Sequence, residues 1–182
     1  LLIIFVLNLN TYYYQGLNYN VQIKKIPLYL KIIDFYARHY HYKELTGELI
    51  KYCKNDEEKI FALFEWTHEN IRKVPDGLPI IDDHVWNIIV RGYGTDDQAQ
   101  DVFTTLCNYA GIKSFFAFIG SKKDNKRITL SFVKLKDKWY VFDAYHSVYF
   151  KDEKGNLVDI EMVMAGRYLL GGKKSEAEID YT

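Results

Sequence analysis

The sequence has no excess charge of either sign, because its 24 Lys and Arg residues balance its 24 Asp and Glu residues. It therefore lacks the overall positive field that attracts proteins to DNA or RNA, and we predict no nucleic-acid partner. Only 3 Pro are present, which excludes proline-rich linkers and stalks. The two cysteines, Cys53 and Cys107, are too few for a disulfide scaffold or a four-thiolate zinc site. We accordingly predict no metal and no cofactor.

What the sequence does have is the composition of a globular protein. Hydrophobic residues make up 48% of the 182 residues, and the aromatic share of 16% includes 16 Tyr. A chain of this length buries roughly 70% of the surface that its unfolded form exposes, which is enough for one core. We expect one domain, with two small ones as the alternative.

The longest apolar run lies at the start of the chain, from Leu1 to Leu9. It is too short to cross a bilayer, which takes about 20 residues. The run is either the end of a signal or anchor segment, which would give a membrane tether, or a buried strand or helix of the domain. The first possibility slightly favours an exported or membrane-associated protein over a cytoplasmic one.

Hydrophobic spacing predicts helices in the first two thirds of the chain and strands after them. The segment from Thr11 to Asn20 reads as irregular. Pro27 suits the first turn of a helix, and the apolar residues after it favour a buried core helix over a membrane-surface one. The predicted helices cover residues 28–51, 55–71, 82–90 and 95–109, with Gly111 as a C-terminal cap, and a final helix or irregular cover spans 160–170. The predicted strands are 112–120, 127–135, 138–143 and 147–151.

This order of elements predicts an α+β fold in which N-terminal helices pack on an antiparallel β meander. We divide the chain into an apolar N-terminal segment (1–20), a helical extension (21–56), a core (57–150) and a C-terminal cover with a loose polar tail (151–182). The tail itself is predicted from Gly171 to Thr182.

Three segments of the predicted core resemble the transglutaminase-like family. The first is the helix Ala-Leu-Phe-Glu-Trp-Thr-His-Glu-Asn-Ile at 62–71. The second is Arg-Gly-Tyr-Gly-Thr-Asp-Asp-Gln-Ala at 91–99, followed by a helix and Ala-Gly-Ile at 110–112. The third is Lys-Trp-Tyr-Val-Phe-Asp at 138–143. The resemblance covers residues 57–150 and implies a papain-like core with a Cys, His and Asp triad.

Matched residue by residue, the resemblance retains little of that triad. The family's Cys stands four residues before Ala99, which is Thr95 in this chain. The family's His falls at Ile128, or at Arg127 if the match slips by one residue, and only Asp143 agrees with the family. The resemblance therefore implies the fold, with a degenerate active site.

The local chemistry of the Thr95 turn points the same way. Thr95 and Gln98 fit the capping-box pattern, in which the Thr hydroxyl accepts a hydrogen bond from the backbone N–H three residues on. Asp96 and Asp97 add negative charge at the helix start, which would raise the pKa of a neighbouring nucleophile. Cys107 falls on the apolar side of the same helix, as an inert buried thiol would.

We predict a degenerate domain that binds a ligand or partner in the inherited cleft. Aromatic, acidic and amide side chains suit a small carbohydrate or a peptide, and a cell-envelope role is one hypothesis. The alternative is an active hydrolase or acyl transferase, with a relocated nucleophile or an acid–base site of Asp96 or Asp97 with His146. The predicted cleft residues are Trp86, Tyr93, Thr95, Asp96, Asp97, Gln98, Asp143 and His146.

Overall fold

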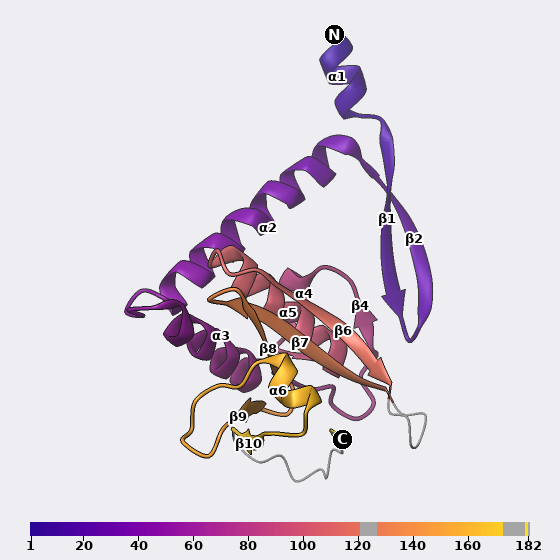
Figure 1. Ribbon diagram of the computed structural model, residues 1–182. Helices are drawn as coiled ribbons and strands as arrows, with labels where there is room; N and C mark the ends of the chain where they lie inside the picture. The colour runs from indigo at the N-terminus through magenta and orange to yellow at the C-terminus, as the bar shows by residue number, and fades with distance from the viewer. Residues whose placement is uncertain (121–126, 173–180, 182) are drawn as a thin grey trace.

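The computed structural model describes residues 1–120, 127–172 and 181 (Figure 1). Its N-terminal part holds α1 (Leu2–Leu7), β1 (Asn10–Leu17), β2 (Asn20–Pro27), α2 (Leu28–Leu49), α3 (Asp56–Asn70), β3 (Arg72–Lys73), β4 (Ile81–Asp82) and α4 (Val85–Arg91). It continues with β5 (Tyr93–Gly94), α5 (Asp96–Tyr109), β6 (Ser114–Gly120), β7 (Arg127–Leu135), β8 (Lys138–Asp143), β9 (Val148–Lys151), α6 (Ile160–Met164) and β10 (Leu169–Gly171).

The largest sheet has five strands in the order β10-β9-β8-β7-β6, and every neighbouring pair is antiparallel. This is the predicted α+β arrangement of helices followed by an antiparallel meander. The strand alternation on β7 shows that both faces of the sheet are covered. Val133 belongs to the cluster built with α3 and α5, whereas Phe132 belongs to a second cluster with Val158 and side chains near α6.

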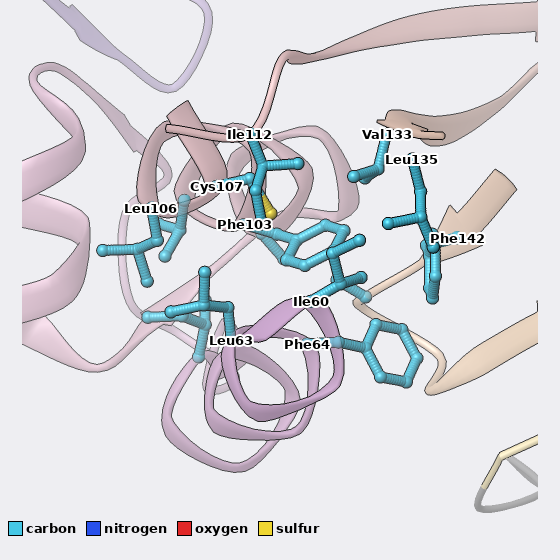
Figure 2. Close-up of a cluster of buried hydrophobic side chains, with 14 of the residues drawn as sticks. Ile60, Leu63, Phe64, Phe103, Leu106, Cys107, Ile112, Val133, Leu135 and Phe142 are labelled. Atoms are coloured by element: carbon cyan, nitrogen blue, oxygen red, sulfur yellow. The ribbon is translucent and has the colours of Figure 1, made fainter. Parts of the chain in front are cut away.

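The main core lies between α3, α5 and the sheet (Figure 2). Residues three and four apart on each helix point into it, as the predicted periodicity requires. The helices contribute Ile60, Leu63, Phe64, Phe103, Leu106 and Cys107, and the sheet contributes Val133, Leu135 and Phe142. Because α5 is packed in this way along most of its length, the position of its N-terminus is fixed relative to β7 and β8.

The predicted edges of the core elements agree closely with the structure. Asn55 is the N-cap of α3, and its side chain accepts a hydrogen bond from the Glu58 backbone N–H. Gly111 follows α5 with a φ of 81°, in the left-handed region that favours glycine. Strands β7 and β8 have the predicted bounds, and the turn between them places Lys136 and Asp137 at positive φ.

Two N-terminal predictions are wrong. The segment from Thr11 to Asn20 is not irregular, because it forms most of a β1–β2 hairpin that turns through Asn18 and Tyr19 at positive φ. Helix α2 is not a buried core helix: Tyr42 and Thr46 are its buried residues, and its first half is exposed. Figure 1 shows why, since α1 and the start of α2 extend away from the sheet, and the hairpin returns to the body at its turn end, where β1 pairs with β4.

Smaller differences occur at two other places. The predicted helix 82–90 begins only at Val85, because residues 81–82 pair with β1. In the segment 160–170, predicted as a final helix or irregular cover, the helix α6 ends at Met164 and the chain then joins the sheet edge as β10. Most of the predicted loose tail, 173–180 and 182, lies outside the described residues.

Candidate functional site

The start of α5 is placed by the short loop that precedes it. Helix α4 ends at Arg91 and is capped by Gly92, whose φ of 70° lies in the left-handed region, and β5 then pairs with β3 through the Arg72–Tyr93 register. Gly94 has no room for a side chain, since a Cβ there would lie 2.9 Å from the Gln98 Oε1 atom. The loop therefore delivers Thr95 to the first turn of α5.

Thr95 caps α5 as predicted. It forms a capping box with Gln98, whose Oε1 accepts a hydrogen bond from the Thr95 backbone N–H at 3.3 Å. The Thr95 hydroxyl donates its own proton to Asp97 Oδ1. This hydroxyl is therefore held by its own helix turn.

Gln98 belongs to a buried network on the side of α5 next to α4. Its Nε2 donates to the Ile81 carbonyl at 2.7 Å, and its Oε1 accepts from Arg91 Nη2 at 3.1 Å. Arg91 also pairs with Asp83, with 2.9 Å between Nη1 and Oδ1, and both side chains are largely buried. These contacts hold the loop against the helix.

On the other side of the α5 N-terminus, a cavity of about 320 Å³ opens between the helix and the ends of β7 and β8. It brings together Thr95, Ile128 and Asp143, the three residues that the sequence resemblance assigns to triad positions. Its lining is Thr95, Asp96, Arg127, Ile128, Thr129, Asp143, Tyr145 and His146. Four of the predicted cleft residues thus share one cavity.

Asp143 is the most heavily hydrogen-bonded residue of this cavity, with its side chain 2% exposed. Oδ1 accepts from Gln100 Nε2 at 2.9 Å and from the His146 backbone N–H at 3.1 Å. Oδ2 accepts from the Tyr181 hydroxyl at 2.8 Å and lies 2.8 Å from His146 Nδ1. Burial, together with the Asp143 carboxylate, raises the pKa of Tyr181.

The Asp143–His146 contact has a chemical consequence. A carboxylate accepts but does not donate, so Nδ1 is the nitrogen that donates to Asp143, and whenever the ring is neutral Nε2 carries the lone pair. The His146 side chain is 25% exposed. The pair therefore presents an oriented imidazole that could accept a proton or a hydrogen bond from a molecule in the cavity.

Gln100 links the three elements that form the cavity, and sequence analysis did not single it out. Its Oε1 accepts from Ser131 Oγ at 2.6 Å and from the Ala144 N–H at 3.2 Å, while its Nε2 donates to Asp143. It joins α5 to β7 and to the end of β8. The one available signal was the position of Gln100, four residues after Asp96 and thus on the same helix face.

The β7 residue that meets the start of α5 is Thr129. Its hydroxyl donates to Asp96 Oδ2 at 3.0 Å. The neighbouring Ile128 lines the cavity too, but it packs against the second hydrophobic cluster. Since successive strand residues point to opposite faces, Arg127 and Thr129 share one face of β7 and Ile128 lies on the other.

The remaining predicted cleft residues lie elsewhere. Asp97 and Gln98 line a neighbouring cavity of about 400 Å³, which shares Thr95 and Asp96 with the first. The Tyr93 ring lies 5.7 Å from the Arg91 guanidinium. Trp86 stacks on His41 of α2 with ring centroids 4.7 Å apart. Trp86 and Tyr93 line neither of these two cavities.

Neither sulfur lies at these cavities. Cys107 is fully buried in the main core, and this burial raises the pKa of its thiol. Cys53 is half-buried in the turn between α2 and α3. Within the described ranges, no group of three or more His, Cys, Asp or Glu side chains could hold a metal ion.

Comparisons with known proteins gave solved structures alone. No family model and no curated protein matches the chain. It is similar to a proposed cysteine protease from Cytophaga hutchinsonii at 17% identity and a TM-score of 0.49, over 73% of this chain and 46% of that one. It is similar to a proposed protease from Parabacteroides distasonis at 18% identity and a TM-score of 0.46, over 57% and 23%. A TGase matches at 11% identity and a TM-score of 0.45, over 74% and 43%. The chain thus spans less than half the length of each of these structures.

Proposed function

We propose that this chain is a transglutaminase-like domain that binds a ligand in the cavity at the start of α5 and performs no thiol chemistry there. One observation carries the proposal. The cavity joins the residues that match the family's triad, Thr95, Ile128 and Asp143, and both cysteine sulfurs lie outside it. A hydroxyl that caps a helix stands where the resemblance would place the reactive sulfur.

The surroundings of Thr95 support a binding role over a nucleophilic one. A hydroxyl needs an adjacent base before it attacks, and the Thr95 proton is donated to Asp97 within the same turn. Asp96 and Asp97 occupy the first turn of α5 and already complement the positive end of the helix dipole. Little of that dipole is left to stabilise a new anion at Thr95.

A small carbohydrate suits this cavity best. Its volume of about 320 Å³ is at the small end of ligand sites. The lining offers carboxylate and imidazole acceptors, a guanidinium donor and the Tyr145 ring, a combination that pairs with sugar hydroxyls and covers a C–H face. A saccharide of the cell envelope is the proposed ligand class, and a peptide is the alternative.

A second candidate function rests on the 2.8 Å contact between Asp143 Oδ2 and His146 Nδ1. An oriented imidazole beside an open cavity could activate a water molecule as a general base, which would make the chain a hydrolase. Sequence reasoning paired His146 with Asp96 or Asp97, whereas the carboxylate in contact is Asp143. This orientation of His146 favours the acid–base form of the alternative over a relocated nucleophile.

The test is titration of the 182-residue chain with cell-wall oligosaccharides and peptides, followed by calorimetry and by NMR. We expect an oligosaccharide to bind, binding to be lost in His146→Ala, and His39→Ala on exposed α2 to bind normally. Release of a hydrolysis product that stops in His146→Ala would favour the second candidate. If no oligosaccharide binds, the carbohydrate assignment is wrong.

Substitution of the two cysteines tests directly whether the site works without a thiol. We expect Cys53→Ser and Cys107→Ser to keep full binding and any turnover, because neither sulfur lies in the cavity. Circular dichroism would show that each variant is folded. Loss of activity in a folded cysteine variant would reject the proposal that this site works without a thiol.

A further inference from the structure

The N-terminal arm, which we define as residues 1–38, has an exposed surface that is a candidate interaction site, separate from the cavity at the start of α5. It comprises α1, β1, β2 and the first half of α2, and Figure 1 shows it reaching away from the sheet with α1 at its far end. It holds many of the exposed large hydrophobic side chains of the described residues. Contiguous exposed apolar surface of this kind marks an interaction site.

The β1–β2 hairpin has one polar face and one apolar face. The polar face turns to the body, where Gln15 Nε2 lies 3.5 Å from Asp83 Oδ2 and the Tyr13 ring lies 5.6 Å from that of His84. Lys24 belongs to this face and donates to Gln15 Oε1 at 3.2 Å. On the opposite face the cross-strand register pairs Tyr12 with Lys25 and Tyr14 with Ile23, whereas Gly16 and Val21, near the turn, line the cavity of about 400 Å³. The side chains of the first two pairs are all exposed, so an apolar face with tyrosines and a lysine points to solvent.

The rest of the arm continues this surface. Every residue from Leu1 to Val6 is exposed, with Phe5 at 67%. On the first half of α2 the exposed large hydrophobic side chains are Tyr29, Leu30, Ile32, Ile33, Phe35 and Tyr36. An apolar helix tip next to an apolar, tyrosine-bearing hairpin is the pattern of a segment that lies at a lipid–water interface.

The charge of the arm differs from that of the body. Residues 1–38 contain Lys24, Lys25, Lys31 and Arg38 against Asp34, which gives 4 − 1 = +3. The remaining residues carry 20 Lys and Arg against 23 Asp and Glu, which gives −3. The neutral total therefore hides a basic, apolar arm on an acidic body, and such an arm is attracted to anionic lipid headgroups.

We propose that the N-terminal arm docks on an anionic membrane surface, with the α1 side chains in the interface and the exposed Lys25 and Lys31 on the headgroups. The arm would lie on the bilayer, because none of the described helices is long and apolar enough to cross one. Pairing two arms face to face would bring two surfaces of +3 together, whereas an anionic bilayer offers both opposite charge and an apolar phase for the exposed α1 side chains. Binding of the arm to the −3 body of a second copy is the competing outcome, which light scattering tests. This proposal is independent of the cavity and of its ligand.

The experiment is co-sedimentation of the 182-residue chain with vesicles of phosphatidylcholine alone or mixed with phosphatidylglycerol. We expect binding to the mixed vesicles that weakens as salt is added, and little binding to phosphatidylcholine. Lys24, Lys25 and Lys31 changed together to Glu should lower the partition coefficient on the mixed vesicles by about tenfold or more. Phe5→Asp should lower it as well, because the apolar tip would lose its insertion.

A matched control separates the arm from overall charge. Lys51, Lys113 and Lys154 are exposed lysines of the body, and changing them to Glu alters the net charge by the same amount. This control should bind as the unchanged chain does, and circular dichroism of both triple variants reports on folding. Equal loss in the two variants, equal binding to both kinds of vesicle, or a dimer in light scattering that Phe5→Asp disrupts would each overturn the proposal.

Discussion

The two ends of helix α5 have different surroundings. Its second half places Phe103, Leu106 and Cys107 in the main core, completely buried. Its first turn carries Thr95 as a cap and faces a polar cavity. The sulfur of this helix thus lies where it is inert, and its first turn carries a hydroxyl that is already hydrogen-bonded. The comparison teaches that packing of one end fixes the geometry of the other.

The largest loss in the free energy of unfolding should come from a substitution at the packed end of α5. Phe103→Ala would remove a fully buried ring that packs on Phe64 and Phe142, with centroids 5.8 and 5.6 Å away. We expect a loss of about 4 kcal/mol in the free energy of unfolding. Urea denaturation followed by fluorescence measures it. A loss below about 1 kcal/mol would mean that α5 is not anchored as described.

The next test is at the junction between the two ends. Gln100→Leu would keep the side-chain size but leave Ser131 Oγ, the Ala144 N–H and one Asp143 hydrogen bond without their partner. We expect a loss of about 2 kcal/mol, because unpaired buried polar groups are costly. Gln100→Glu is the informative companion, since it keeps the acceptor but places a second acid beside Asp143. Equal stability of Gln100→Leu and the parent would remove Gln100 from its linking role.

Asp101, next to Gln100 on α5, should make the stability of the protein depend on pH. Burial raises the pKa of its carboxyl from 3.8 to about 6. The folded state then binds the proton more tightly than the unfolded state, so this group's contribution to stability falls as pH rises from about 4 to about 6. Asp101→Asn should gain about 1.5 kcal/mol over the parent at pH 7 and nothing below pH 4. Thermal melts of both proteins across this range check it, and a pH-independent difference would contradict it.

The smallest expected effect is at the polar end. Thr95→Ala removes the cap hydroxyl, and we expect about 1 kcal/mol of destabilisation. Thr95→Ser keeps the cap and should match the parent. An unchanged melting temperature in Thr95→Ala would count against the structural role of this hydroxyl.

The core of the fold could be predicted because its signals are local. The Asn55 cap, the glycine after α5 and the β7–β8 turn each depend on residues within a few positions of one another. The N-terminal arm could not, because its hairpin turns through Asn18 and Tyr19 with no glycine in the turn. An apolar sequence on α2 also does not reveal whether other elements cover it, and here they leave its first half exposed.

Several residues of the candidate site could be predicted from the sequence, but the contacts that organise them could not. Thr95, Asp96, Asp143 and His146 come together as lining of one cavity. The contacts that organise them span long stretches of sequence, as Tyr181 reaching Asp143 across 38 residues does. No periodicity or spacing reports such a contact, because it joins two residues that lie far apart in the sequence.

Because Cys107 is buried, the reactivity of its thiol can report transient opening of the core. A thiol reagent can reach this sulfur only when α5 separates from the sheet, whereas the half-buried Cys53 should react first and serve as an internal clock. The labelling rate of Cys107 would therefore report how often the core opens. A molecule that binds at the first turn of α5 and favours the closed form would slow that rate, which turns an unreactive side chain into a sensor for ligands of the neighbouring cavity.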